Sequence, residues 1–224
     1  MILLAIPVFG QDQKKKMQST VINILGANVY EQPTFGSKTL TKLVVGELIT
    51  IEKQIPSNER FQIGPGFSIP GNWIKPESID GYIFSSDLTD KEVDTGLNKF
   101  GQHLINLRGK LLSTETEEKQ TETPMGNFPK YFEFKYYENG NYTYIEWDGC
   151  FDHIYEYKNL SVNEVYHQMV SDYSKLINEN EISVPSFFEK VDNNVKFEGV
   201  GATQDLTIEC KENGISVVSS YDCT

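Results

Sequence analysis

Two Asn-Gly dipeptides, each between two runs of alternating apolar residues, constrain the fold of this chain more than any other feature. Asn-Gly is a strong short signal for a β-hairpin, because both residues tolerate the positive φ of a tight turn. Asn139-Gly140 joins the runs Tyr131–Tyr137 and Asn141–Trp147, and Asn213-Gly214 joins two later runs. The sequence therefore predicts antiparallel hairpins in the second half of the chain.

The turns also determine which side chains share a face, because side chains alternate between the two faces of a sheet. With the first Asn-Gly pair as the two turn residues, Phe132 lies opposite Trp147 on an apolar face. The next turn, Asp148-Gly149-Cys150, leads to a third strand at Phe151–Tyr157. We expect this face to pack in the core and the loop to have three residues, since that register keeps the Asp152 carboxylate out of the core. A two-residue loop would place Asp152 on that face.

A helix is predicted to begin at Ser161-Val162-Asn163-Glu164, which has the spacing of a capping box. Apolar residues then recur at helical spacing, at Val162, Val165, Tyr166, Met169, Val170, Tyr173, Leu176 and Ile177. The pattern predicts a helix that ends near Asn178 and packs this stripe into a core. Residues 91–224 are therefore expected to form an α+β domain, an antiparallel sheet with one long helix.

The segment Ser113–Thr123 contains only Ser, Thr, Glu, Lys and Gln. A run of this composition is typical of a solvated loop. We expect its four glutamates to form a solvated face rather than a cation site.

Residues 20–90 have a different pattern, with short apolar runs bounded by Gly, Pro and Asn. Leu48–Ile51 is the clearest strand, and Trp73–Lys75 and Tyr82–Phe84 flank a short connection. The pattern predicts a small all-β barrel, followed by a polar linker at 89–94. The fold class expected for the whole chain is thus mainly β with α.

Several segments of the first module occur in an order and spacing that resemble the bacterial SH3-like (SH3b) domain family. They are Ala27–Tyr30 followed by Pro33, Leu43 with Gly46–Ile51, Trp73–Lys75, Gly81–Ile83 and Ser85–Leu88. The resemblance covers about 70 of the 224 residues. The chain departs from the family pattern in having Tyr30 in place of Arg and Tyr82 in place of Trp. It also has a long insertion, Gln54–Asn72, so the ligand groove usual in the family need not be present here.

The resemblance implies a binding module that recognises peptide or cell-wall material. Aromatic side chains beyond those that fill a small barrel lie on its surface, where they offer contact area at low entropic cost. The candidate ligand-binding residues are Tyr30, Phe35, Phe61, Phe67, Trp73 and Tyr82. Two alternatives remain open: Trp73 and Tyr82 fill or cap the barrel, or the loop with Phe61 and Phe67 folds over it as a lid.

The apolar run at the N-terminus favours export, although no basic residue precedes it. Ile2–Phe9 has the length of a signal-peptide apolar region and is far shorter than the roughly 20 residues of a spanning helix. We expect residues 1–19 to be a signal-peptide remnant and a polar linker, and the protein to be periplasmic or secreted. The alternative is that the apolar run forms the first β-strand. No transmembrane segment is predicted.

The charge of the chain disfavours nucleic acid as a partner. There are 20 Lys and Arg against 32 Asp and Glu, a formal net charge of −12, which repels a phosphate backbone. Residues 1–96 carry 9 basic and 11 acidic residues, and residues 97–224 carry 11 and 21, a net charge of −10. The acidity therefore lies in the second module.

One Cys/His group, Cys150 with His153 and His167, could carry chemistry. A cysteine nucleophile requires activation, for example at a helix N-terminus, whereas Cys150 follows a turn between strands. A zinc site lacks a paired motif and a fourth ligand at the usual spacing. The sequence therefore predicts no catalytic residue, no metal and no cofactor.

The three cysteines allow one disulfide if the protein is exported. A turn at Asn213-Gly214 places Cys210 opposite Val217, so Cys223 lies about 20 Å further along the strand, beyond the roughly 7 Å between the Cα atoms of a disulfide. Cys210 is expected to be a buried, reduced core residue. Cys150 and Cys223 are the remaining pair, and the alternative is three free thiols.

Together these features predict an exported, non-catalytic binding protein whose SH3b-like domain recognises a peptide, cell-wall or protein ligand. One alternative is a cell-wall hydrolase or amidase with its active site in the second domain. Another is an acidic protein–protein adaptor or inhibitor whose second domain meets a basic partner.

Overall fold

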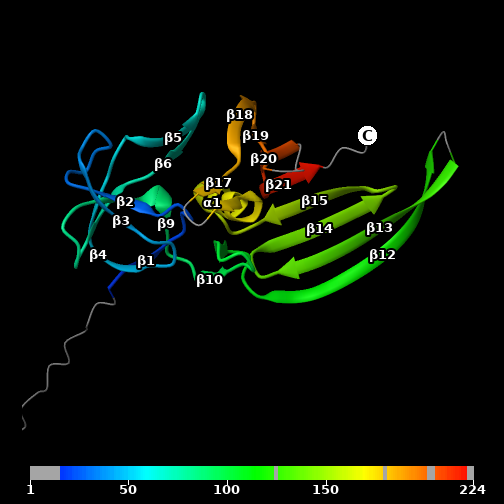
Figure 1. Ribbon diagram of the computed structural model, residues 1–224, viewed down its shortest axis with the longest axis horizontal. Coiled ribbons are helices and arrows are strands. Elements are labelled where there is room, and N and C mark those ends of the chain that lie inside the picture. The colour runs from blue at the N-terminus through cyan, green and yellow to red at the C-terminus, as the bar shows by residue number, and fades with distance from the viewer. Residues whose placement is uncertain (1–15, 124–125, 179–180, 201–204, 221–224) are drawn as a thin grey trace, which may run out of the picture.

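The computed structural model describes residues 16–123, 126–178, 181–200 and 205–220. This part of the chain is mainly β, as the sequence predicts, and contains 21 short or long strands and one α-helix. The N-terminal strands form one end of the molecule, and a long twisted sheet extends from the other (Figure 1). Most of the expected signal-peptide segment lies outside the described residues.

The first module contains three small antiparallel sheets. The largest has the order β8–β7–β4–β1–β9, with bounds Ile83–Phe84, Trp73–Pro76, Leu48–Ile55, Gln18–Val21 and Leu88–Thr89. The other two are the hairpins β2 (Ala27–Tyr30) with β3 (Thr39–Leu43) and β5 (Arg60–Gly64) with β6 (Phe67–Pro70). A short 3-10 helix, η1, spans Ser85–Asp87.

These described sheets do not close into a barrel, which corrects the expectation of a closed one. The β2–β3 hairpin meets the five-stranded sheet through an isolated bridge between Tyr30 and Tyr82. The β5–β6 hairpin, which lies within the insertion, contacts β18 (Ser186–Val191) of the second module. The hairpin between β4 and β7 therefore extends to the second module, and its strands do not complete a barrel.

The second module is built on an eight-stranded antiparallel sheet. Its order is β12–β13–β14–β15–β21–β20–β19–β18, with bounds Leu111–Thr123, Gly126–Tyr137, Gly140–Trp147, Cys150–Tyr157, Gly214–Ser220, Asp205–Lys211, Asn194–Glu198 and Ser186–Val191. Two further pairs are β10 (Asp94–Leu97) with β11 (His103–Asn106) and β16 (Lys175–Asn178) with β17 (Glu181–Ser183).

The α-helix α1 spans Val162–Tyr173 and starts where the capping box predicts. The backbone N–H of Ser161 donates to Glu164 Oε2 at 2.8 Å. The helix ends before Asn178, because the backbone becomes extended at Ser174 and β16 begins one residue later. Leu176 and Ile177 thus continue the apolar pattern of the helix but lie in a strand.

The segment Ser113–Thr123 is not a loop, contrary to expectation. It belongs to β12 and pairs with β13 to the end of both strands. An edge strand has only one neighbour to pair with, and charged side chains protect its free edge from pairing with other chains. Threonine also favours the extended conformation. The lack of apolar residues is therefore compatible with a strand at this position.

The hairpin turns lie one residue earlier than predicted. Tyr137 pairs with Gly140, so the loop residues are Glu138 and Asn139, and Phe132 lies opposite Ile145 instead of Trp147. The shift in pairing is two residues, so the same residues share a face. That face lies outside both hydrophobic cores of the described residues, which corrects the expectation that it packs in the core. The last hairpin shifts in the same way, which places Cys210 opposite Ile215.

The turn at Asp148 has two loop residues, so the three-residue loop that we favoured is wrong. Trp147 pairs with Cys150, and Asp152 lies opposite Ile145. Asp148 and Gly149 both have positive φ, 46° and 78°, as a two-residue type I′ turn requires. The local preference of this turn outweighs the cost of a carboxylate on the face, since Asp152 is only half-buried.

The two modules share a hydrophobic core across the expected boundary near residue 90. The larger cluster of buried side chains includes Ile22, Val45 and Phe67 of the first module together with Val165 and Phe197 of the second. A smaller cluster, with Val29 and Ile74 among its members, fills the first module alone. The modules are thus joined by apolar packing as well as by the chain.

Candidate functional site

Four of the six predicted ligand-binding residues come together in one aromatic cluster on the first module. The ring centroid of Phe35 lies 5.9 Å from Tyr30, 6.2 Å from Phe61 and 5.1 Å from Trp73. Most of these pairs are tilted or edge-to-face, the arrangements that aromatic quadrupoles favour. We call Tyr30, Phe35, Phe61, Trp73 and Phe84 the aromatic cluster.

Trp73 is the buried residue on which most of the other rings of the aromatic cluster pack. Its side chain is 1% exposed, and its Nε1–H donates to Glu59 Oε2 at 2.8 Å. The other oxygen of Glu59 accepts a hydrogen bond from Thr34 Oγ1 at 2.7 Å. Because Trp73 is buried, it does not offer a contact surface to a ligand, and its role is to support Phe35 and Tyr30, which are half-buried.

Phe67 is separated from this group. It is buried, and its ring lies 6.4 Å from Phe197 in the core that the two modules share. The insertion therefore does not form a lid over the first module: Phe61 packs on the aromatic cluster, whereas Phe67 packs against the second module. This removes Phe67 from the predicted ligand surface.

Tyr82 lies next to the aromatic cluster and is half-buried. Its backbone N–H donates to the carbonyl of Tyr30 at 2.8 Å, and the Tyr30 N–H donates back at 2.7 Å. Lys75 Nζ lies 6.0 Å from the Tyr82 ring centroid. Tyr82 thus holds the β2 strand in place through its backbone and leaves part of its ring at the surface.

Two members of the site were missed by sequence reasoning. Phe84 is 2% exposed and lies 4.7 Å from Phe35 between ring centroids. It pairs directly with Trp73 across β7 and β8, so the predicted hairpin contained the signal for it. Glu59 lies in the insertion, and no pattern in the sequence places it next to Trp73.

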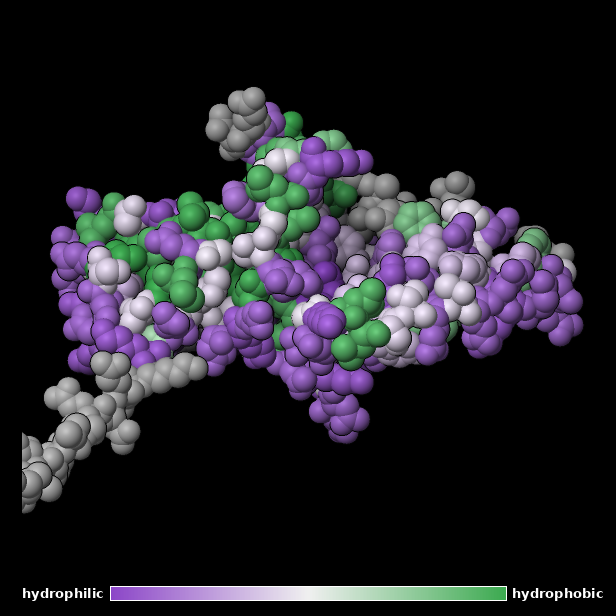
Figure 2. All heavy atoms as spheres, turned by 90° about the horizontal axis from the view of Figure 1, so that it is seen from below, coloured by the Kyte–Doolittle hydropathy of each residue, from purple (hydrophilic) through white to green (hydrophobic). Residues whose placement is uncertain are grey.

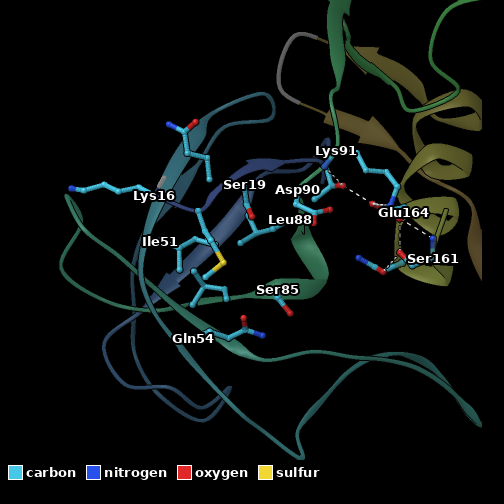
Figure 3. A pocket seen from close by; sticks show the side chains of 15 residues that line it. Lys16, Ser19, Ile51, Gln54, Ser85, Leu88, Asp90, Lys91, Ser161 and Glu164 are labelled. Carbon is cyan, nitrogen blue, oxygen red and sulfur yellow. Dashed lines mark hydrogen bonds and ion pairs between the residues drawn. The ribbon is translucent and has the colours of Figure 1, made fainter. Parts of the chain in front are cut away.

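A second candidate is a cleft of about 760 Å³ between the first module and the start of α1. Figure 3 shows Lys16, Ile51 and Gln54 on one side and Lys91 and Glu164 on the other. The cleft combines both charges with apolar side chains. Its composition alone therefore does not select a ligand.

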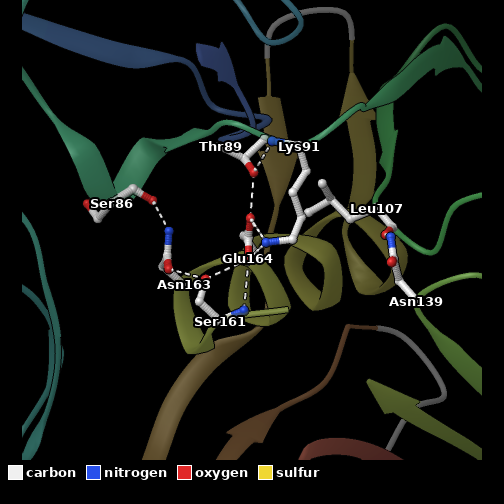
Figure 4. A network of polar contacts seen from close by, with 8 residues as sticks. All are labelled: Ser86, Thr89, Lys91, Leu107, Asn139, Ser161, Asn163 and Glu164. Atoms are coloured by element: carbon white, nitrogen blue, oxygen red, sulfur yellow. Dashed lines mark hydrogen bonds and ion pairs between the residues drawn. The ribbon is translucent and has the colours of Figure 1, made fainter. Parts of the chain in front are cut away.

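The polar groups at one end of this cleft hold the two modules together (Figure 4). Glu164 accepts hydrogen bonds from Thr89 and Ser161, and Lys91 Nζ lies 3.2 Å from both of its carboxylate oxygens. Burial opposes ionisation of Glu164, but these hydrogen bonds and the charge of Lys91 outweigh it and lower the pKa. These interactions join Thr89 at the end of β9, and Lys91 after it, to the first turn of α1.

A buried Asp87–His167 pair lies nearby. Asp87 Oδ1 accepts from Asn23 Nδ2 at 3.0 Å and lies 3.6 Å from His167 Nε2. Burial raises the pKa of Asp87 to about 6, and burial lowers the pKa of His167 to about 4. His167 Nε2 lies 2.9 Å from the Ser86 carbonyl, to which the neutral ring donates. This histidine therefore has a structural role between the modules.

The Cys/His group of the sequence is not assembled as a nucleophile. Cys150 is disulfide-bonded, so it is not a free thiol, and Cys210 is the free cysteine in the described chain. Cys223 lies outside the described residues, so the Cys150–Cys223 pair stays a prediction. His153 Nδ1 lies 2.7 Å from the Tyr142 hydroxyl. In the described residues no group of His, Cys, Asp and Glu side chains could hold a metal ion.

Comparisons with protein-family models, curated proteins and solved structures found no match to this chain. Within the described residues, no helix is long and apolar enough to cross a membrane.

Proposed function

We propose that this chain is an exported, non-catalytic binding protein whose SH3b-like first module recognises peptide or cell-wall material. The observation that carries the proposal is the aromatic cluster, in which the half-buried rings of Tyr30 and Phe35 contact buried Trp73, and half-buried Phe61 contacts Phe35. Hydrophobic side chains gather over the first module in Figure 2, whereas the extended sheet is mainly polar.

The support beneath the rings favours binding. Trp73 is fixed by Glu59, and Phe35 contacts Trp73 and Phe84 at ring distances of 5.1 and 4.7 Å. Side chains that are already ordered lose little conformational entropy when a ligand binds. Tyr30 and Phe35 therefore offer apolar contact area at low cost.

Binding to purified peptidoglycan and to its stem peptides tests the proposal. We expect Phe35→Ala and Tyr30→Ala to weaken binding about tenfold, as loss of an aromatic anchor does at other interfaces. Phe188→Ala is the matched control, because Phe188 is 60% exposed on β18 of the second module. Thermal unfolding of each variant establishes that the fold is retained. If Phe35→Ala does not fold, Phe35→Leu replaces it in the binding test, because leucine keeps an apolar side chain at this position but removes the aromatic ring.

Two outcomes would contradict the proposal. One is that the wild-type protein binds neither peptidoglycan nor its peptides, or that the Phe35 and Tyr30 variants bind them as tightly as the wild type does. The other is lysis of purified cell wall in a zymogram, which would identify an enzyme. Export is tested separately, by fractionation of cells that produce the full chain.

A further inference from the structure

The side of the long sheet that faces away from α1 carries an apolar strip. Tyr155 and Val217 pack into the core beside α1, and side chains alternate along each strand. The pairing of β13, β14 and β15 therefore places the even-numbered residues of β13 and the odd-numbered residues of β14 on the opposite side. We call Phe132, Phe134, Ile145 and Trp147 on that side the outer strip.

The fold of the described chain does not account for the outer strip. Its four side chains are half-buried, and none of them belongs to either hydrophobic core of the described residues. An antiparallel sheet with one face on a core normally has polar residues on the other. Contiguous exposed apolar residues bounded by polar ones are a mark of interaction sites.

Acidic side chains border the outer strip along both of its long edges. On β12, Glu115 pairs with Phe134 and Glu117 with Phe132. On β15, Asp152 pairs with Ile145. The whole segment from 111 to 157 has ten Asp and Glu against three Lys, a formal net charge of −7.

Two lysines close the strip at one end. Lys119 Nζ lies 5.5 Å from the Phe132 ring centroid, and Lys130 Nζ lies 4.7 Å from the Trp147 centroid. Lys119 Nζ also forms a salt bridge with Glu117 Oε2 at 2.7 Å. The basic groups are thus confined to one end, and the long edges remain acidic.

The width of the strip suits a helix. Neighbouring strands are about 4.8 Å apart, so the acidic edges on β12 and β15 are separated by roughly 14 Å. A helix with side chains is about 10–12 Å across. A helix lying along the strands would place its apolar stripe on Phe132, Phe134 and Ile145, and basic residues on its flanks would reach Glu115, Glu117 and Asp152.

We propose that the outer strip binds an amphipathic helix of a partner protein, with Lys or Arg on both sides of its apolar stripe. Charge complementarity selects this occupant. A second copy of the chain would bring the acidic edges of two such strips together, which like-charge repulsion opposes. The proposal concerns a different face from the aromatic cluster and does not depend on the ligand there.

The test is binding of a fluorescein-labelled helical peptide of Leu and Lys, designed with one apolar stripe, to the full chain at low and high salt. Glu115→Gln with Glu117→Gln removes two charges from the edge of the strip. Glu118→Gln with Glu122→Gln is the matched control, because these residues lie on the same strand with side chains on the other face. We expect the first pair to weaken binding about fivefold at low salt and the control pair less than twofold.

The designed peptide should also bind less tightly at high salt, and its Leu/Glu counterpart should not bind. The proposal is overturned if the Leu/Lys peptide does not bind, or if both double variants lose the same affinity. It is also overturned if the wild-type chain forms a dimer in sedimentation equilibrium that Phe134→Lys abolishes, because the strip would then be a self-association surface.

Discussion

Gly140 and Gly214 begin the returning strands of the two Asn-Gly hairpins, and both approach the backbone of β15. A Cβ at Gly140 would lie 2.0 Å from the carbonyl oxygen of Glu156, and one at Gly214 would lie 2.4 Å from that of Tyr157. Both glycines have positive φ, 155° and 145°. The glycine of each pair is therefore required by close packing, while the turn itself is formed by the two preceding residues.

We expect Gly140→Ala to lower the free energy of unfolding by at least about 2 kcal/mol, since a backbone atom of β15 has to move. The control is Gly96→Ala in β10, where a Cβ would meet nothing within 4 Å. It should change stability by less than about 0.5 kcal/mol. Urea denaturation measures both, and equal effects of the two substitutions would contradict the packing argument.

Titration of Asp87 makes the stability of the contact between the modules depend on pH. Its pKa is raised by burial from 3.8 to about 6, so the folded state favours the protonated carboxyl. The stabilisation from that protonation is complete below pH 3.8 and is lost as the pH rises through 6. His167 acts in the other direction, because its pKa is lowered from 6.5 to about 4 and its contribution is lost as the pH falls through 4.

Asp87→Asn isolates the carboxyl, because the amide oxygen can still accept the hydrogen bond from Asn23. We expect the stability of this variant relative to the wild type to rise between pH 4 and pH 7, by on the order of 2–3 kcal/mol. Denaturation at a series of pH values measures the difference. A stability difference that stays constant over this range would show that Asp87 titrates normally.

At the scale of elements, the β5–β6 hairpin connects the modules. Phe67 enters the shared core beside Phe197, and a Cβ on Gly64 would lie 2.2 Å from the ring of Phe187. The same hairpin presents Phe61 to the aromatic cluster. One insertion thus contributes to the packing of both modules.

Phe67→Ala should lower the free energy of unfolding by roughly 3–5 kcal/mol, the usual cost of removing a buried phenylalanine ring. Phe188→Ala, at an exposed position of β18, should change it by less than about 0.5 kcal/mol. Thermal or urea denaturation compares the two. A loss of stability below about 1 kcal/mol for Phe67→Ala would mean that the hairpin does not join the modules as described.

At the scale of the whole molecule, the shared core favours cooperative unfolding. Ile22 and Val45 of the first module pack in the same cluster as Met169 and Val217 of the second. The contacts of Glu164 with Thr89 and Lys91 add a polar connection. A change in stability of one module should therefore be transmitted to the other.

The two tryptophans, Trp73 and Trp147, provide one fluorescence probe for each module. Trp73→Phe removes the hydrogen bond to Glu59 and destabilises the first module, and Trp147 remains as the reporter of the second. We expect the unfolding midpoint reported by Trp147 to fall together with that measured by circular dichroism. An unchanged Trp147 midpoint would show that the modules unfold independently.

Features that depend on neighbouring residues could be predicted from the amino-acid sequence. The capping box located the start of α1 at Val162, and the Asn-Gly pairs located two hairpins to within one residue. The alternation of β13 and β14 identified the apolar face with Phe132 and Ile145. In these cases the controlling interactions lie within a few positions along the chain, so local propensity is sufficient.

Features that depend on distant partners could not be predicted in this way and are known from the three-dimensional fold. β12 is a strand because β13 pairs with it, and α1 ends at Tyr173 because the following residues pair with β17. Phe67 is buried in the core that the modules share, whereas Trp73 is buried in the aromatic cluster, since burial depends on which surfaces of the two modules meet. Composition and spacing do not encode those contacts, because they form between residues that are far apart in the sequence.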